Sequence, residues 1–344
     1  MKAKRVYAIG VLVLVFLVWS SVGLAAGLEK VRASHQPCMH ALPTILCQKL
    51  GWFKELGIDV SFHYYSSGMP QVEAGLAGEW DVGAIGTSPA FFAGMRHNFP
   101  IIACSNDESV TNNVMVRKKD YKRLTQNPKK ALKGTTWLVS TISTGHHVVL
   151  AYLDSIGLPE RDIKIVHMEQ PAILSAFIAG QGDVAQTWAP FNYLHEREGE
   201  VVLAHGKMVN TVVPGAVIAT KKFANEHPDL VAKWLQGYMK GVHYMISEPF
   251  KSAKYLQDYY KEVGIDLTYE EVLKEFKLRP LFGIYDQLML FSREETPYST
   301  YDKWIDSLGD FYLKVKRIKE KPDVRTFITD KFLKMVEADM MKMR

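Results

Sequence analysis

The chain has 344 residues and a formal net charge of +5 at pH 7, and this length predicts two domains, each with its own core. Removing residues 1–26 takes away three basic residues and no acidic one, which leaves a charge of only +2. That small charge, without a basic stripe among aromatic residues, argues against nucleic-acid binding. The three cysteines, Cys38, Cys47 and Cys104, are too few and too widely spaced for a disulfide framework or a zinc cluster.

Residues 1–26 are typical of a secretory signal peptide. Three basic residues precede an apolar run from Val6 to Trp19, and the small residues Ala25 and Ala26 follow. An uncleaved membrane anchor is the alternative, but the uncharged stretch is shorter than a membrane span prefers. No cysteine follows directly to carry a lipid anchor. We therefore expect a periplasmic or secreted protein. In such an oxidising compartment Cys38 and Cys104 would form a disulfide bond if the strands that precede them are neighbours in the sheet.

Strands and helices alternate from residue 30 to residue 106. The pattern predicts strands at 30–35, 58–65, 80–86 and 100–106. One continuous helix is expected between the first two strands, ending at Gly57, and the next helix ends at Gly78. Such an alternation predicts an α/β fold with a parallel sheet and helices on both of its faces.

The alternation then starts again. Further strands are predicted at 114–118, 135–140, 163–168, 183–188 and 201–206, with helices between them. From about residue 214 the chain becomes helical, and we expect these helices to pack on the first sheet because they have none of their own. The predicted organisation is therefore a discontinuous first lobe, residues 28–106 plus 214–344, and an inserted second lobe, residues 107–213.

One short motif occurs twice, as Ala-Gly-x-x-Asp-Val at 77–82 and at 179–184. Each copy joins the end of a predicted helix to a predicted strand. We interpret the repeat as the same helix-to-strand corner in each lobe, and therefore as scaffold. The residues that follow each strand are the better candidates for a site.

Five segments, in this order and spacing, resemble the periplasmic ligand-binding proteins of ABC importers for nitrate, sulfonates, taurine and thiamine pyrimidines. The resemblance implies a two-lobed, type II periplasmic binding protein, with a mainly parallel sheet flanked by helices in each lobe. It also implies a small-molecule ligand held in the cleft between lobes by hinge closure, ABC permease and ATPase partners, a monomer, and no cofactor or metal. The segments are GWFKELGIDVSFHYY, AGEWDVGAIGTSPA, LKGTTWLVSTISTGHHVVLAYLDSIGL, DIKIVHMEQPAILSAFIAGQGDVAQTWAPF and PGAVIATKKFANEHPDLVAKWLQGY.

Ligands of open α/β sheets bind beyond the carboxyl ends of the strands, where helix N-termini offer unpaired N–H groups. The strongest such segment is STISTGHH, which aligns with the ligand-contacting loop of the family that the chain resembles. The alternative roles of these residues are purely structural. The hydroxyl residues would be ordinary helix caps, Trp188 would be a core residue, and His146 would lie on an exposed helix face. The predicted ligand-binding residues are Gln36, Thr87, Ser88, Ser143, Thr144, Gly145, His146 and Trp188.

The predicted loops contain no lysine or arginine, so recognition is expected to rest on neutral donors and helix dipoles. A small organic anion, best a sulfonate, fits this description, and a pyrimidine or an aromatic carboxylate remains open. The sequence contains no nucleophile elbow, phosphate-binding loop or zinc-protease motif, so we expect no enzyme. It also lacks the cysteine-rich motif of the thiamine-pyrimidine-forming enzyme to which this fold is related. The alternative to a transport function is a ligand sensor that reports to a signalling partner.

Overall fold

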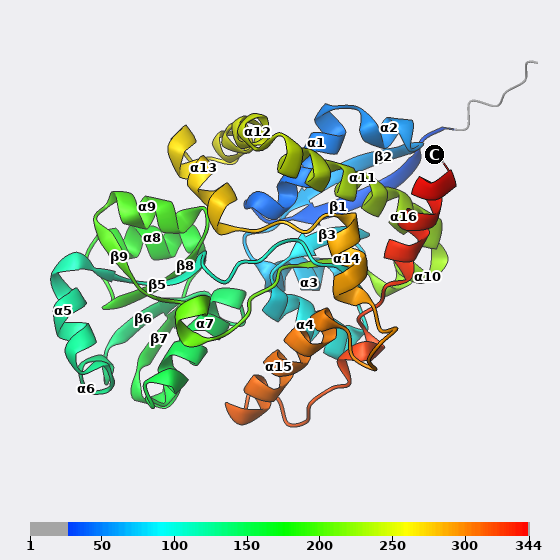
Figure 1. Ribbon diagram of the computed structural model, residues 1–344. Coiled ribbons are helices and arrows are strands. Elements are labelled where there is room, and N and C mark those ends of the chain that lie inside the picture. The colour runs from blue at the N-terminus through cyan, green and yellow to red at the C-terminus, as the bar shows by residue number, and fades with distance from the viewer. Residues whose placement is uncertain (1–26, 343–344) are drawn as a thin grey trace, which may run out of the picture.

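The computed structural model describes residues 27–342, and the predicted signal peptide lies outside them. Two five-stranded sheets form two lobes that lie side by side (Figure 1). The first sheet has the order β2-β1-β3-β10-β4 and the second β7-β6-β8-β5-β9. The α/β, two-lobed fold is thus confirmed. The first sheet contains β1 (Glu29–His35), β2 (Ile58–Tyr64), β3 (Val82–Ile85), β4 (Ile101–Ala103) and β10 (Ala216–Ala219), and the second β5 (Asn112–Arg117), β6 (Thr136–Val139), β7 (Lys164–His167), β8 (Val184–Trp188) and β9 (Glu200–His205).

Each sheet is mainly parallel and has one reversed strand. β10 is antiparallel to both β3 and β4, and β5 is antiparallel to both β8 and β9. The reversed strands are those by which the chain enters the second lobe and returns to the first. The sequence pattern did not predict β10, whose four residues are all fully buried.

Helices flank both sheets. In the first lobe, the continuous helix expected before Gly57 is divided, because Gly51 has a left-handed conformation, with φ = 76°. The helices before the return crossover are α1 (Leu42–Lys49), α2 (Trp52–Glu55), α3 (Gly68–Leu76), α4 (Thr87–His97), α5 (Lys118–Gln126), α6 (Pro128–Leu132), α7 (Thr144–Ser155), α8 (Gln170–Ile178) and α9 (Phe191–Arg197). Short 3-10 turns lie at Met39–Ala41, Glu160–Asp162, Gly206–Val209 and Val324–Thr326.

The C-terminal helices only partly follow the expectation that they cover the first sheet. Side chains such as Trp234, Phe291 and Tyr301 join the core of that sheet. In contrast, α12 and α13 pack through Tyr259 and other side chains against α1 and against Tyr193 of the second lobe. The helices are α10 (Lys221–Glu226), α11 (Pro228–Ser247), α12 (Pro249–Glu262), α13 (Tyr269–Leu278), α14 (Ile284–Phe291), α15 (Thr300–Lys314) and α16 (Lys331–Lys342).

Two crossover segments, residues 104–111 and 206–215, connect the lobes. They run together: the N–H of Glu108 donates to the carbonyl of Val213 at 2.8 Å, and that of Gly215 donates to Asn106 at 2.7 Å. Such a pair of adjacent connections is a natural hinge. Cys38 and Cys104 are both free thiols, because they follow β1 and β4, which β3 and β10 separate.

The duplicated corner has the same structural role in both lobes. Asp81 accepts a hydrogen bond from the backbone N–H of Arg32 at 2.8 Å, and Asp183 accepts one from the N–H of Thr136 at 2.8 Å. In each copy the glycine after the helix has a positive φ, 77° at Gly78 and 88° at the second copy, which only glycine adopts without strain. Each carboxylate therefore holds the neighbouring strand in register.

Candidate functional site

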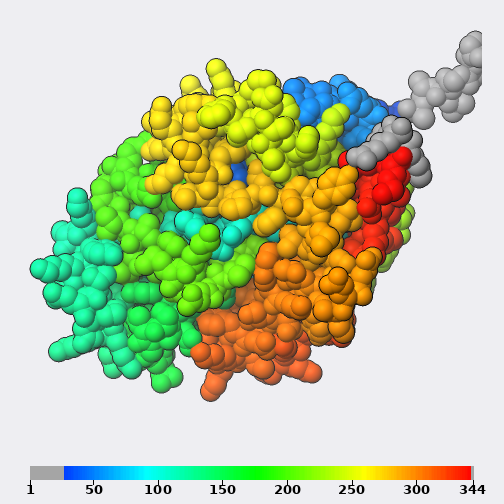
Figure 2. Space-filling view, viewed as in Figure 1, coloured from blue at the N-terminus to red at the C-terminus, as the bar shows by residue number. Residues whose placement is uncertain are grey.

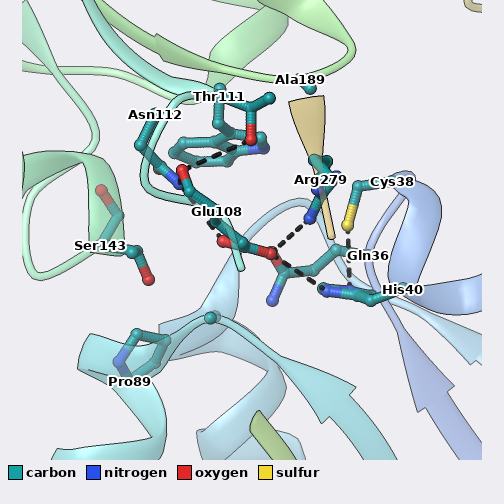
Figure 3. Close-up of a pocket in the computed structure, with 14 residues that line it drawn as sticks. Gln36, Cys38, His40, Pro89, Glu108, Thr111, Asn112, Ser143, Ala189 and Arg279 are labelled. Atoms are coloured by element: carbon teal, nitrogen blue, oxygen red, sulfur yellow. Dashed lines mark hydrogen bonds and ion pairs between the residues drawn. The ribbon is translucent and has the colours of Figure 1, made fainter. Parts of the chain in front are cut away.

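A small cavity lies between the lobes, where the carboxyl ends of both sheets meet (Figure 3). Its volume is about 30 Å³, which is room for roughly two water molecules. The space-filling view shows the second lobe in contact with the C-terminal helices over most of this boundary (Figure 2). The lining residues are Gln36, Cys38, His40, Gly68, Gly86, Pro89, Glu108, Thr111, Asn112, Ser143, Thr144, Trp188, Ala189 and Arg279.

The N-terminus of α7 forms one wall. Ser143 is the N-cap: its hydroxyl accepts from the N–H of His146 at 3.1 Å and donates to the carbonyl of Ser140 at 2.6 Å. Thr144 is the first residue of the helix, and both side chains line the cavity. Because the first N–H groups of a helix have no partner within it, this end is suited to anions.

The N-terminus of α4 faces that of α7 from the other lobe. The N–H of Ser88 donates to the hydroxyl of Thr144 at 3.4 Å. A side-chain carbon at Gly86 would lie 2.3 Å from the same hydroxyl oxygen, so only glycine permits this approach. The hydroxyls of Thr87 and Ser88 are bonded elsewhere, the first donating to Pro214 and the second accepting from Tyr312 at 2.7 Å. Neither residue lines the cavity, to which this end of the helix contributes Gly86 and Pro89.

Gln36 and Trp188 lie at strand ends on opposite sides of the cavity. The amide of Gln36 donates to Gln71 at 2.9 Å. Trp188 is the last residue of β8 and is only partly buried, and its indole lines the cavity. A tryptophan placed here can stack on a planar or apolar part of a ligand.

Four of the predicted residues do not line the cavity: Thr87, Ser88, Gly145 and His146. A side-chain carbon at Gly145 would lie 1.8 Å from the amide nitrogen of Gln186, so this glycine packs against the sheet of its own lobe. The Nε2 of His146 lies 3.1 Å from Glu160 of the same lobe and 3.5 Å from Arg317 of the first lobe. Its position suggests a role in lobe contact.

Sequence reasoning missed the charged floor of the cavity. Arg279, just after α13, is buried and forms ion pairs with Glu108 of the first crossover and with Glu275 at 2.7 Å. The predicted loops contain no arginine, but the helical tail brings Arg279 to the cavity from outside them. No motif marks Arg279; only its position in the fold reveals it.

The environment of the floor sets the charges of its groups. Burial alone would raise the pKa of Glu108, but the charge of Arg279 and the contributions of His40 and Asn112 together outweigh it and lower that pKa to about 2. Burial lowers the pKa of the His40 imidazole and raises that of the Cys38 thiol. The Cys38 sulfur lies 3.0 Å from Nε2 of His40. Burial thus favours the uncharged form of each group.

Comparison with known proteins identifies the fold and the family. A family model described as "NMT1/THI5 like" matches residues 39–252. The chain belongs to this family. A putative aliphatic sulfonates-binding protein of Bacillus subtilis is 27% identical over 340 residues, which cover 94% of this chain and 96% of that protein. The taurine-binding periplasmic protein of Escherichia coli is 27% identical over 57% of this chain and 60% of its own.

Solved structures of family-like proteins share the fold. The periplasmic nitrate-binding protein of Synechocystis PCC 6803 superposes with a TM-score of 0.75 at 10% identity, covering 91% of this chain and 89% of that one. The alkanesulfonate-binding protein of Xanthomonas axonopodis pv. citri, bound to MOPS, superposes with a TM-score of 0.70 at 17% identity, covering 89% and 99%. These structures share the two-lobed fold of this chain. Its family match makes it a solute-binding protein of the class that serves ABC importers, and not an enzyme.

The family model covers only part of the residues that line the cavity. Most of the lining residues lie within the matched residues 39–252, but Gln36, Cys38 and Arg279 lie outside them. Within residues 27–342, no helix is long and apolar enough to cross a membrane. In the same part of the chain, no three His, Cys, Asp or Glu side chains are arranged to hold a metal ion.

Proposed function

We propose that the protein captures a small organic anion, best a sulfonate, in the cleft between its lobes. The observation that carries this proposal is the meeting of two helix N-termini, those of α4 and α7, with the hydroxyl of Thr144 3.4 Å from the N–H of Ser88. A sulfonate oxygen beside Thr144 would accept hydrogen bonds from this N–H and from the first turn of α7. Two helix dipoles would then act on one anionic group.

The printed names of relatives support a sulfonate over other anions, since they include an aliphatic sulfonates-binding and a taurine-binding protein. We further propose that the protein works as a monomer in the periplasm and delivers its ligand to an ABC permease and ATPase. Of the predicted residues, Gln36, Ser143, Thr144 and Trp188 line the cavity and form the proposed ligand-binding set, the last by stacking, together with the N–H of Ser88 beside Thr144.

Ligand entry requires movement of the lobes. The cavity of about 30 Å³ is too small for a sulfonate with an organic substituent. Opening at the paired crossovers would separate α4 from α7, and closure would then bring both N-termini onto the ligand. The structure thus corresponds to a tightly closed arrangement of the lobes.

Changing Thr144 tests the proposed anion site. Thr144→Val keeps the shape of the side chain and removes its hydroxyl, whereas Thr144→Ser keeps the hydroxyl. A hydrogen bond to a charged group contributes about 1.5–3 kcal/mol, so the valine variant should bind the sulfonate at least about tenfold more weakly. Isothermal titration, on ligands first found by thermal shift, measures this. Equal affinities of the valine variant and the wild type would contradict the site.

The thermal-shift screen also tests the ligand class. A ligand at 100 times its Kd raises the free energy of unfolding by about 2.7 kcal/mol. The screen includes alkanesulfonates, inorganic anions, pyrimidines and aromatic carboxylates, because the indole of Trp188 would also suit a planar ring. We expect the largest shift from a sulfonate. A shift from the pyrimidines alone would replace the sulfonate with a heterocycle as the proposed ligand.

A further inference from the structure

A second groove lies at the boundary between the lobes, at the far end of α7 from the ligand cleft. Its volume is about 400 Å³, which is in the range of small-molecule sites. Leu150 and Leu158 line it from the second lobe, and Val315, just after α15, lines it from the first. It shares no lining residue with the cleft cavity. Figure 1 shows α15 beside the second lobe at this boundary.

Positive charge exceeds negative charge in this groove. Its two carboxylates, those of Asp154 and Glu160, each form an ion pair with a basic side chain of the other lobe. Arg161 and Lys316 also line the groove, and neither has an ion-pair partner within residues 27–342. The groove therefore presents unpaired cations from both lobes, which attract an anion.

A third cation approaches the groove from α6. A side-chain carbon at Gly157, which lines the groove, would lie 3.6 Å from the Nζ of Lys129. Lys129 likewise has no ion-pair partner in the described part of the chain. Three segments that are far apart in the sequence thus bring one unpaired cation each to the same groove. Like charges gathered in this way repel one another unless an anion lies between them.

The backbone at Lys316 is an independent observation. This residue follows the last turn of α15 and has a left-handed conformation, with φ = 61°. Glycine is the usual residue at such a helix end, because a side chain makes the conformation less favourable. The sequence instead places a long cationic side chain here, and that side chain lines the groove.

We propose that this groove is a second binding site, for a small anion with two or three carboxylate groups, and that its occupant stabilises the closed lobes. Lys129 and Arg161 bind the anionic groups from the second lobe and Lys316 from the first, while the leucine side chains contact the carbon skeleton. The three cations converge only when the lobes are closed. An occupant therefore increases the affinity of the cleft for its ligand, and the cleft ligand increases the affinity of the groove by the same factor.

Isothermal titration with citrate, succinate and acetate at pH 7 and constant ionic strength tests the site, with no sulfonate present. Citrate should bind most tightly and acetate least, because several cations face the groove. Arg161→Gln/Lys316→Gln should bind citrate at least about tenfold more weakly, since each exposed ion pair contributes up to about fivefold. Absence of saturable binding of both citrate and succinate, or unchanged affinity in the double variant, would overturn the proposal.

A charge-matched variant separates the groove from the net charge of the protein. Lys122→Gln/Lys319→Gln removes two exposed lysines that do not line the groove. Its affinity for citrate should stay within about twofold of the wild type, because salt screens distant charges. Equal weakening in both double variants would show that citrate responds to overall charge and not to this site.

The coupling between the two sites, unlike the groove itself, rests on the proposed function. Saturating citrate should increase the affinity for the sulfonate about fivefold in the wild type and leave it unchanged in Arg161→Gln/Lys316→Gln. An unchanged affinity in the wild type would reject the role of the groove in closure. If citrate binds and no sulfonate does, the proposed function fails and the groove stands. A decrease in the radius of gyration on adding citrate then measures closure, and an unchanged radius would reject it.

Discussion

At the scale of single residues, Arg279 is the side chain on which the floor of the cleft depends most. Arg279→Met would leave Glu108 and Glu275 buried without their cation. Removal of one partner of a buried ion pair costs about 3–5 kcal/mol, and we expect a loss of this order in urea unfolding. Arg325→Met, which removes an exposed ion pair with Asp323, is the control and should change stability little. Equal stability of Arg279→Met and the wild type would contradict the described network.

The same scale shows what residue types alone can and cannot predict. Ser143 and Thr144 were predictable, because hydroxyl residues between a strand and a helix lie at the carboxyl edge of a sheet whatever the details of the fold. The hydroxyl of Ser88 was not, since its bond to Tyr312 depends on a helix more than 200 residues later in the chain. Arg279 and Glu108 belong to no motif, and only the tertiary fold brings them together.

At the scale of elements, α15 and the segment after it join the lobes. Glu160 of the second lobe accepts from Arg317 and lies 3.1 Å from Nε2 of His146, and Lys314 pairs with Asp154 at 2.7 Å. Figure 1 shows α15 beside the second lobe. The pairs of Arg317 with Glu160 and of Lys314 with Asp154 bridge the two lobes, so they stabilise the closed arrangement.

Glu160→Gln should speed ligand release. The side chains of Glu160 and Arg317 are each about one-third exposed, so the pair is expected to contribute no more than about 1 kcal/mol. The dissociation rate should therefore rise about fivefold, as measured by stopped-flow displacement. Asp154→Asn breaks the more exposed pair with Lys314 and should have a smaller effect. An unchanged rate in Glu160→Gln would show that these contacts do not limit opening.

The contribution of Glu160 should depend on pH. Burial acts to raise its pKa, but the hydrogen bond with His146 and the charge of Arg317 outweigh burial and leave the pKa below 4.5. A carboxyl group with a lowered pKa stabilises the closed form above its ordinary pKa and loses this effect as the pH falls through the lowered value. Lowering the pH should therefore increase the rate of ligand dissociation less in Glu160→Gln than in the wild type.

Elements were predicted well where periodicity is long and poorly where it is short. The strand and helix alternation of both lobes follows directly from the pattern. β10 is a run of four apolar residues, which fits a strand or a buried helix equally well, and only pairing with β3 and β4 decides between them. For the same reason, the packing of α12 and α13 against the second lobe could not be predicted from their amphipathic patterns.

At the scale of the whole molecule, the sequence predicted two lobes with a site between them, because α/β units in series each present a carboxyl edge. The chain returns to the first sheet through β10, and the two crossovers then lie side by side. This arrangement places α4 and α7 opposite each other. The central claim is that one anionic group of the ligand binds between these two helix ends.

A crystal structure of the complex with 2-aminoethanesulfonate, or with whichever sulfonate gives the largest thermal shift, tests this claim most directly. The account predicts sulfonate oxygens within hydrogen-bond distance of the N–H of Ser88 and of the first turn of α7 near Thr144. A sulfonate bound outside the cleft, for example in the basic groove around Lys30 and Lys221 at the other end of the first sheet, would contradict it.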